Sequence, residues 1–493
     1  MRNNRNIKIT KLAAKKFNLL FFIIIIVSNI LQAQPRNYWS TSFNSEASLL
    51  AGAVVGGNSD ITSIYYNPAG ISEIEDQKFA LNANLFNLSL TTYKNALGTD
   101  LHSDYLGFTV QPRFISYIFK LKKADKLTWQ FAIFNRNNNR IAVYDQIEKP
   151  VNIIHPAINE NYTGNFDFTN EYDDSWGGIG TAYKISDNFI VGGSVLFSIK
   201  SLTYMNLINI NISPITETLP DTINLYSAYS SNYDKVVMYD VRATGKIGVR
   251  YKLDRLSFGL NLSLPSVRIM GNSDVKRTIS NTGIYDDGIR IEDNYSNESA
   301  VYLKSGFKEP VSLSFGIVYK DLSGNNSYYF TTEYFHKIDT YKAIDGTAVI
   351  DDEYVPGSDF ISYKLGAKSI INFAAGWQFH TSEKFEVLLG FRTNFDPYYV
   401  SNSEQYQGLN EFMNPSSNYY HFTGGSKFNY KKLSVIAGIE YILGVNKGLT
   451  EFVNFSEPEI GADDNLALAG KKNNDMTYVY NAVGLYFGFT FGF

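Results

Sequence analysis

The chain has no cysteine, only 13 prolines and only five histidines among its 493 residues. Without cysteine it cannot form disulfides, thiolate metal sites, a cysteine nucleophile or the lipid-modified cysteine of a lipoprotein. The histidines are scattered, and none has metal-ligand spacing with a carboxylate. Gly-rich phosphate loops and nucleophile elbows are also missing. We therefore expect no metal, no cofactor and no enzymatic activity.

A strong charge imbalance is missing as well. The chain carries 44 basic and 48 acidic residues, a formal net charge of -4, which gives no reason to expect nucleic acid as a partner. A mean hydropathy of -0.18 argues against a helical membrane bundle. Aromatic residues are plentiful instead: 36 Tyr, 35 Phe and four Trp make up 15% of the chain, which argues against disorder.

The N-terminus predicts an export signal. Residues 1–16 carry six basic side chains and no acidic one, and residues 17–31 form an apolar run that is followed by the small residue Ala33. This order is typical of a secretory signal peptide. The alternative is a membrane anchor helix, for which about 15 apolar residues is short. We predict a signal peptide over 1–33.

Most of the remaining chain alternates apolar and polar residues with a period of two. Segments 241–251 and 256–264 both alternate, and the polar turn 252–255 between them predicts a β-hairpin with one apolar face. Fourteen such strands are predicted, at 78–92, 111–121, 127–144, 161–185, 188–207, 233–251, 256–269, 301–320, 326–341, 363–380, 384–396, 418–430, 433–446 and 475–493.

The connections between these strands alternate between short turns and long polar loops. Long loops are predicted at 93–110, 145–160, 208–232, 270–300, 342–362, 397–417 and 447–474. Short periplasmic turns and long extracellular loops are typical of outer-membrane barrels. The alternative, a soluble β-sandwich or propeller, would have a polar outward face and no such sorting of loops. The predicted fold class is an all-β, 14-stranded antiparallel transmembrane β-barrel of the bacterial outer membrane, formed by residues 78–493.

Residues 34–77 do not alternate. Small residues crowd the first half of this segment, which favours a compact hatch or plug inside the lumen, and a barrel of 14 strands is wide enough to hold one. Asn67-Pro68-Ala69-Gly70 follows, just before the first predicted strand. The last strand alternates aromatic residues up to a terminal Phe493, similar to the C-terminal signal of inserted outer-membrane barrels.

These features together resemble the FadL family of outer-membrane transport proteins. The resemblance implies a 14-stranded barrel with an N-terminal hatch and uptake of hydrophobic molecules, of which long-chain fatty acids are the best-known. It also implies binding first in a groove between extracellular loops, then in a pocket inside the barrel, before the hatch rearranges. Asn67, Pro68, Ala69 and Gly70 would carry the hatch motif. The alternative is an Asx-type turn that only leads into the first strand.

A fatty acid needs an apolar sleeve and a cation near its carboxylate. Candidate lumen contacts for the carboxylate are Arg242, Lys246, Arg250 and Arg392. The alternative is that these cations neutralise lumen acids such as Asp240, Glu386 and Glu440.

An apolar loop is expected after the fifth strand, where the resemblance places the entry groove. Candidate contacts there are Leu207, Ile210, Ile212, Ile215 and Leu219. The alternative is a lid that packs on its neighbours. The partner loop, 270–300, is polar and charged, which departs from an apolar groove.

The third strand contains the polar run 135–140, Asn-Arg-Asn-Asn-Asn-Arg. In the family a kink in this strand opens sideways, so the run indicates a bulge. The alternative is a strand that extends above the membrane.

The sequence therefore predicts passive uptake of hydrophobic compounds, with the lipid bilayer and an apolar small molecule as partners. The alternative is a barrel subunit of an outer-membrane secretion or assembly complex that docks other proteins. A general diffusion porin is a third possibility, which the predicted hatch argues against.

Overall fold

The computed structural model describes residues 37–39, 43, 45–57, 61–74, 78–121, 124–154, 158–215, 227–286, 288–349, 358–413, 417–463 and 465–492. The predicted signal peptide, residues 1–33, lies outside the described residues. Two α-helices, α2 (Glu46–Leu49) and α3 (Ser63–Tyr66), and the 3-10 helix η2 (Pro68–Glu73) precede the first strand, and η3 (Asp359–Ile361) and η4 (Glu404–Tyr406) lie in later connections. None of the helices in this described part has both the length and the apolar character needed to span a bilayer.

The strands form one antiparallel sheet that closes on itself, because β1 pairs with both β2 and β20. Their bounds are β1 (Lys78–Lys94), β2 (Ser103–Leu121), β3 (Ala124–Val151), β4 (Glu160–Lys184), β5 (Phe189–Pro214), β6 (Ala228–Leu253), β7 (Leu256–Ser263), β8 (Val267–Thr282), β11 (Asn294–Ser305), β12 (Ser312–Lys320), β13 (Asn326–Phe335), β14 (Ile338–Val349), β15 (Tyr363–Ala367), β16 (Ile370–Ser382), β17 (Phe385–Asn394), β18 (Tyr419–Tyr430), β19 (Leu433–Leu449) and β20 (Met476–Gly492). A small separate hairpin joins β9 (Tyr285–Asp286) and β10 (Ile289–Arg290).

Four strands of the wall are each interrupted once, so that β7 with β8, β11 with β12, β13 with β14, and β15 with β16 follow one another along the wall. With each of these pairs counted as one strand, the barrel has the 14 antiparallel strands that the sequence predicts. Closure also excludes the open β-sandwich as an alternative, because no edge is left unpaired where β1 meets β20.

The outer surface of the barrel is apolar on all sides. Exposed large apolar side chains occur on strand after strand, among them Phe79, Phe131, Phe197, Leu313, Phe373, Phe422 and Phe489. An apolar belt of this kind belongs against lipid tails, because water-soluble proteins rarely expose such a large apolar surface. The alternation of the sequence therefore places its apolar face outward.

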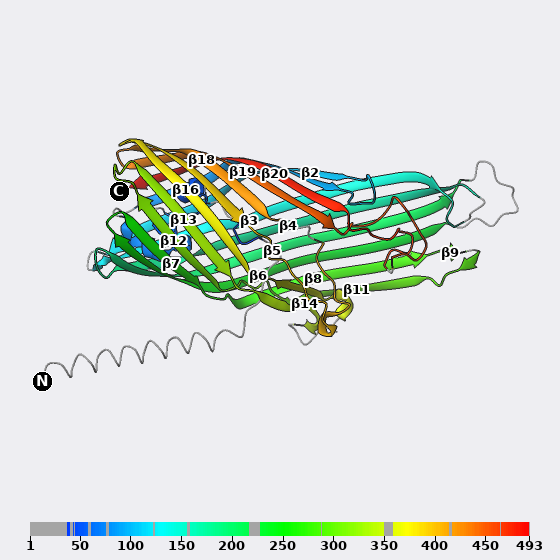
Figure 1. The fold of residues 1–493 in the computed structure, drawn as a ribbon. Helices are drawn as coiled ribbons and strands as arrows, with labels where there is room; N and C mark the ends of the chain where they lie inside the picture. The colour runs from blue at the N-terminus through cyan, green and yellow to red at the C-terminus, as the bar shows by residue number, and fades with distance from the viewer. Residues whose placement is uncertain are drawn as a thin grey trace.

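Most of the predicted long loops are wrong in their bounds, and three of them contain the largest extensions of strands. Strand β3 continues to Val151, β5 continues to Pro214, and β8 and β11 occupy most of 270–300. Figure 1 shows β3, β4, β5 and β6 running well beyond the short strands β7, β12, β13 and β16. The alternation continues there, with buried Ile208, Ile210 and Ile212. The outward residues become polar because this part of the sheet lies beyond the apolar belt. In the sequence, that polarity looks the same as the polarity of a loop.

Candidate functional site

Residues 45–57 and 61–74, which we call the N-terminal segment, pack against the inner face of the wall on two opposite sides. Helix α2 contacts β17, β18 and β19, whereas α3 and η2 contact strands of the β3–β6 side. The segment is held by single polar bonds to several strands. These are Glu46 with Lys427 on β18 (2.6 Å), Val55 with Thr331 on β13 (3.3 Å), the Gly56 carbonyl with Ser257 on β7 (2.6 Å) and the Ile64 carbonyl with Ser194 on β5 (3.0 Å).

The predicted hatch motif, Asn67 to Gly70, makes a further connection to the wall. The Asn67 side-chain oxygen accepts a hydrogen bond from the Ala69 amide (3.1 Å), which caps η2, and Pro68 occupies the first turn, where no N–H is needed. The Asn67 Nδ2 donates to the carbonyls of Val55 (2.8 Å) and Val249 on β6 (3.2 Å). The local geometry is the Asx-type turn that the sequence analysis kept as the alternative, and the same side chain also joins the segment to the wall.

Glycines in the wall give the segment room to lie flush against it. A Cβ at Gly248 on β6 would collide with the side chain of Asn67, and one at Gly259 on β7 would collide with the carbonyl of Val55. These positions explain why glycine stands on lumen-facing parts of both strands, where any side chain would push the segment inward.

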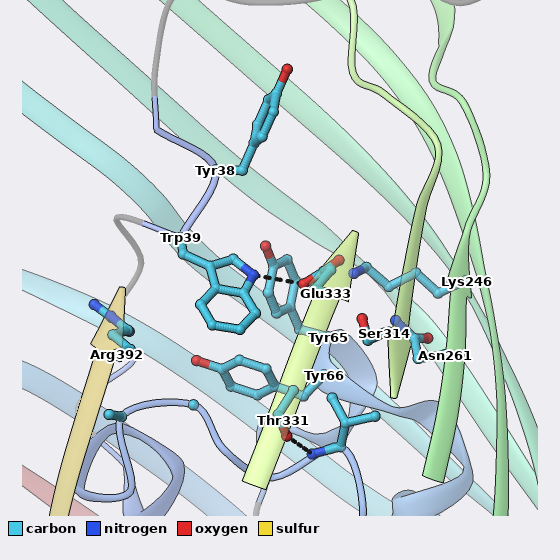
Figure 2. Close-up of a pocket in the computed structure, with 13 residues that line it drawn as sticks. Tyr38, Trp39, Tyr65, Tyr66, Lys246, Asn261, Ser314, Thr331, Glu333 and Arg392 are labelled. Carbon is cyan, nitrogen blue, oxygen red and sulfur yellow. Dashed lines mark hydrogen bonds between the residues drawn. The ribbon is translucent and has the colours of Figure 1, made fainter. Parts of the chain in front are cut away.

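A narrow cavity lies between this segment and the wall. It holds about 410 Å³ of space outside the atoms, spread in gaps between side chains. It is lined by Tyr38, Trp39, Ala51, Gly52, Val55, Tyr65, Tyr66, Lys246, Asn261, Ser314, Thr331, Glu333 and Arg392 (Figure 2). Aromatic rings and a few polar groups on its walls match the usual lining of a small-molecule site.

Two interactions organise the upper side of the cavity. The Trp39 indole N–H donates to Glu333 on β13 (2.6 Å), a bond that Figure 2 draws as a dashed line. The Lys246 Nζ lies 4.1 Å from the centre of the Tyr65 ring, a cation–π contact. Burial raises the pKa of the Tyr65 hydroxyl to about 12, so the ring stays neutral beneath the cation. Two of the predicted carboxylate contacts, Lys246 and Arg392, thus line one cavity.

The four predicted cations differ in their partners. Arg242 lies 3.4 Å from Asp240, Arg392 lies 3.0 Å from Glu440, and Arg250 forms an ion pair with Glu73 of η2. Neutralisation by protein acids, the alternative kept above, is therefore what the geometry favours for these three. Within the described residues, no carboxylate lies within ion-pair distance of Lys246. Of the four, Lys246 is the cation best placed to receive a ligand's charge.

The backbone ladder between β2 and β3 stops partway along the two strands. Their remaining halves, toward the end of the barrel with the long connections (the mouth), are not paired with each other. Their ladder runs from Leu121 with Ala124 up to Phe114 with Phe134, and in the described residues no backbone pair follows beyond that point. Both strands nevertheless continue, β2 to Ser103 and β3 to Val151. Residues 103–113 of β2 and 135–151 of β3 therefore pair only with β1 and β4 and lack a backbone ladder to each other.

The predicted bulge lies beside this unpaired stretch. Asn135 faces Ser175 and Asn137 faces Asp174 on β4, which leaves Arg136 without an opposite residue. The buried side chains of β3 change at this point from even to odd numbers, so the strand turns over. The structure shows the bulge, and β3 also continues past it to Val151.

Arg136 is the centre of a buried charge network that the sequence analysis missed. It lies 2.6 Å from Glu309 and 3.4 Å from Asp174, and Lys200 pairs with both acids. Its guanidinium also stacks on Trp176, with 5.0 Å to the ring centre. The network joins β3, β4 and β5 to the break between β11 and β12. Arg136 continues the inward series of even-numbered residues 128–134, so alternation already places it in the lumen. Its partners lie 38 to 173 residues away in the chain, so alternation could not have found them.

The mouth end of the lumen is filled by aromatic side chains, which we call the mouth cluster. Its buried rings are Tyr93, Tyr162, Phe166, Phe168, Tyr172, Tyr204, Phe307, Tyr341, Tyr363, Phe412, Phe452, Phe455 and Tyr478. Stacked pairs include Phe166 with Phe452 (5.3 Å between ring centres) and Tyr363 with Phe412 (4.7 Å). Strands β4 and β5 supply the wall side, and the connections after β17 and β19 fill the interior.

The predicted entry-loop contacts belong to this region but not to a loop. Ile210 and Ile212 are buried in the mouth cluster, on β5. Leu207 points to the opposite face, Ile215 is exposed just after the strand, and Leu219 lies outside the described residues. The prediction of a loop is wrong because period two continues through 202–212. The alternative was that these residues pack on their neighbours. Ile210 and Ile212 do so, because both are buried against the mouth cluster.

No family model matches the chain, and no curated protein matches its sequence. Among solved structures it shares its fold with a Pseudomonas aeruginosa FadL homologue (TM-score 0.56, 12% identity, 94% of this chain and 100% of that one). It is also similar to the P. putida toluene transporter TodX (0.53, 13%, 92% and 99%). The CymD monoaromatic hydrocarbon channel is a third (0.50, 10%, 93% and 98%). The class is thus a 14-stranded barrel, and the chain has a FadL-like fold.

Proposed function

We propose that this chain is an outer-membrane channel for the passive uptake of hydrophobic compounds, long-chain fatty acids or molecules of similar character. One observation supports this more than any other. The cavity adjoins the unpaired part of the wall, because Tyr65, which lines the cavity, packs on Phe134 (5.7 Å between ring centres), the last β3 residue paired with β2. A FadL-like fold and the hydrocarbon channels that share it agree with this function.

The proposed route has three parts. An apolar ligand enters by replacing contacts within the mouth cluster, since apolar rings lose little when another apolar surface takes their neighbour's place. It then occupies the cavity, which widens when residues 45–74 shift and exchange single hydrogen bonds for bonds to water. It leaves between β2 and β3, where no ladder must be broken. Each step exchanges contacts of similar kind, so no energy source is required.

Lys246 is the proposed partner of a ligand carboxylate. Replacing Lys246 with Ala should weaken binding of a fatty acid roughly tenfold, because one charge-assisted hydrogen bond is lost. Binding of the fatty alcohol of equal length should be unchanged. The measurement is equilibrium binding to the purified barrel in detergent. Lys246→Arg should retain the preference, and Lys235→Ala, exposed on the same strand, is the matched control.

An equal loss for acid and alcohol would mean that Lys246 only shapes the cavity. No loss for either would remove it from the site and favour uncharged ligands, such as aromatic hydrocarbons, without touching the uptake proposal.

A second candidate function is docking of other proteins. It is favoured by the long strands of the mouth end: β3 has 28 residues and β5 has 26, whereas β17 has ten and β18 has 12. This part of the sheet presents a large surface beyond the apolar belt. Gentle purification followed by mass spectrometry separates the two functions. Stoichiometric bound fatty acid or hydrocarbon supports uptake, and a stable protein partner with no apolar ligand would contradict it.

A further inference from the structure

A second pocket opens on the outside of the wall, away from the lumen cavity. It has about 590 Å³ of space open to a water-sized molecule and lies where the breaks after β7 and after β11 meet the start of β14. Its lining includes the exposed Val267 and Lys304 at the surface and the buried Arg242 and Tyr341 at its base. The pocket therefore reaches from the outer surface into the thickness of the wall.

The pocket is strongly basic. Five of its lining residues are cations, namely Arg242, Arg268, Lys304, Lys308 and Lys342, and one, Asp345, is an acid. Lys342 is neutralised by Asp345 (3.3 Å) and Asp359 (2.6 Å), and Arg242 lies near Asp240. Within the described residues, no carboxylate lies within ion-pair distance of Arg268, Lys304 or Lys308. Three cations thus share the pocket without an anion of the protein.

The strand register forces these cations together. Arg242 on β6 and Arg268 on β8 are directly opposite residues, and like charges in that position repel each other. Backbone carbonyls of Ser305 (2.9 Å) and Gly271 hold the Arg268 guanidinium in place without neutralising it. The Lys308 Nζ lies 4.1 Å from the centre of the Tyr341 ring. The donors are therefore positioned before any ligand arrives, which lowers the entropy cost of binding one.

The depth of the pocket matches the outer edge of the apolar belt. Val267 pairs with Ala243, which lies ten residues along β6 from Leu253 at the short-turn end. At about 3.3 Å per residue and a tilt of about 40°, ten residues rise about 25 Å, the height of the apolar band of such barrels. The exposed Val267 lines the pocket, and Leu264, Ile269 and Met270, within three residues of it in the chain, are also exposed. The cations of the pocket and the apolar surface therefore lie at the same height along the barrel axis.

We infer that this pocket binds the phosphate of an anionic lipid in the outer leaflet of the membrane. Arg268 offers a planar fork to the phosphate, Lys304 and Lys308 add point charges, and the acyl chains lie on the apolar residues around the opening. That apolar rim is why the ligand is a lipid rather than free phosphate. The inference rests on the proposed membrane location but not on the transported compound.

The test uses the full chain purified in detergent and native mass spectrometry with three probes: dioleoyl phosphatidic acid, dioleoylglycerol and inorganic phosphate. The wild type should retain phosphatidic acid roughly tenfold more than dioleoylglycerol, which has the same tails but no phosphate. The combined variant Arg268→Gln/Lys304→Gln/Lys308→Gln should lose that preference. The matched control Lys320→Gln/Lys384→Gln/Lys432→Gln removes three exposed cations at the short-turn end and should keep it.

Equal retention of both lipids by the wild type, or unchanged retention by the triple variant, would overturn the inference. So would displacement of the lipid by an equal concentration of inorganic phosphate, because that identifies a free-phosphate site. If the triple variant does not fold, Lys304→Gln/Lys308→Gln gives the same test and leaves the Arg268 backbone bonds intact. Uptake assays on the same variants separate the two proposals, because lipid binding can fail while uptake persists. If the protein is absent from the outer membrane, both proposals lose their basis.

Discussion

The two ends of the lumen are closed in different ways. At the short-turn end, residues 45–74 are joined to the wall by single hydrogen bonds and ion pairs, such as Thr423 to the Leu49 carbonyl (2.8 Å). At the mouth, closure is by packed rings such as Phe166 and Phe452. Polar bonds exchange readily for bonds to water, whereas buried rings separate only when another apolar surface replaces them. Under the proposed function, the mouth would therefore favour apolar ligands, and the N-terminal segment is the part that we expect to rearrange.

The largest effect is expected from deleting residues 45–70. Loss of this segment should raise the conductance of the barrel to small ions severalfold. The lumen at the short-turn end of the barrel would then hold only side chains of the wall. Recordings in planar bilayers measure this. Phe452→Ala, which changes only the mouth, is the comparison and should raise conductance less. Unchanged conductance after the deletion would show that the mouth cluster alone seals the lumen.

The next largest effect concerns the charge network between the two ends. Arg136→Ala leaves Glu309 and Asp174 buried with only Lys200, and breaking a buried pair costs about 3–5 kcal/mol of unfolding free energy. Arg140→Ala, four residues along the same strand, removes an exposed pair with Glu171 and should cost about 1 kcal/mol or less. Denaturant unfolding in detergent compares the two. Equal costs would mean that the network does not stabilise the bulge.

Phe452→Ala tests the mouth itself. Removing a buried ring that stacks on Phe166 should cost about 3 kcal/mol, at the lower end for such changes because neighbouring rings can close in. The loss of hydrogen-exchange protection should be confined to the mouth-side halves of β4 and β5. Phe422→Ala, on the outer apolar belt, is the control. Loss of protection spread evenly over the barrel would contradict separate closure of the two ends.

The smallest effect is expected at the motif of the N-terminal segment. Asn67→Ala should cost about 1 kcal/mol through loss of the cap on η2. Asn67→Asp keeps the acceptor for the Ala69 amide but loses the donors to Val55 and Val249. If attachment to the wall controls opening, both variants should increase brief openings in single-channel recordings. If only the turn matters, Asp will behave as the wild type does.

The number and direction of the strands could be predicted from the sequence, because the alternation of lipid-facing and lumen-facing residues is a local property. Within the apolar belt, the alternation also predicted the positions of β5 and β6 in the chain correctly. It failed in 208–232 and 270–300, where the outward face is polar because the sheet stands in water. Asn67 to Gly70 could be recognised as a turn, although its bonds to β6 could not.

By itself, then, the sequence determined a closed β-barrel with an apolar exterior and a non-alternating segment before the first strand. Only the tertiary structure decided which cations are neutralised and which are not. Arg250 meets Glu73 from 177 residues earlier in the chain, whereas Lys246, two lumen-facing positions away on the same strand, meets the ring of Tyr65. The physical reason is that charge pairing depends on register, bulges and the position of the inner segment, and none of these is written in the local pattern of any one strand.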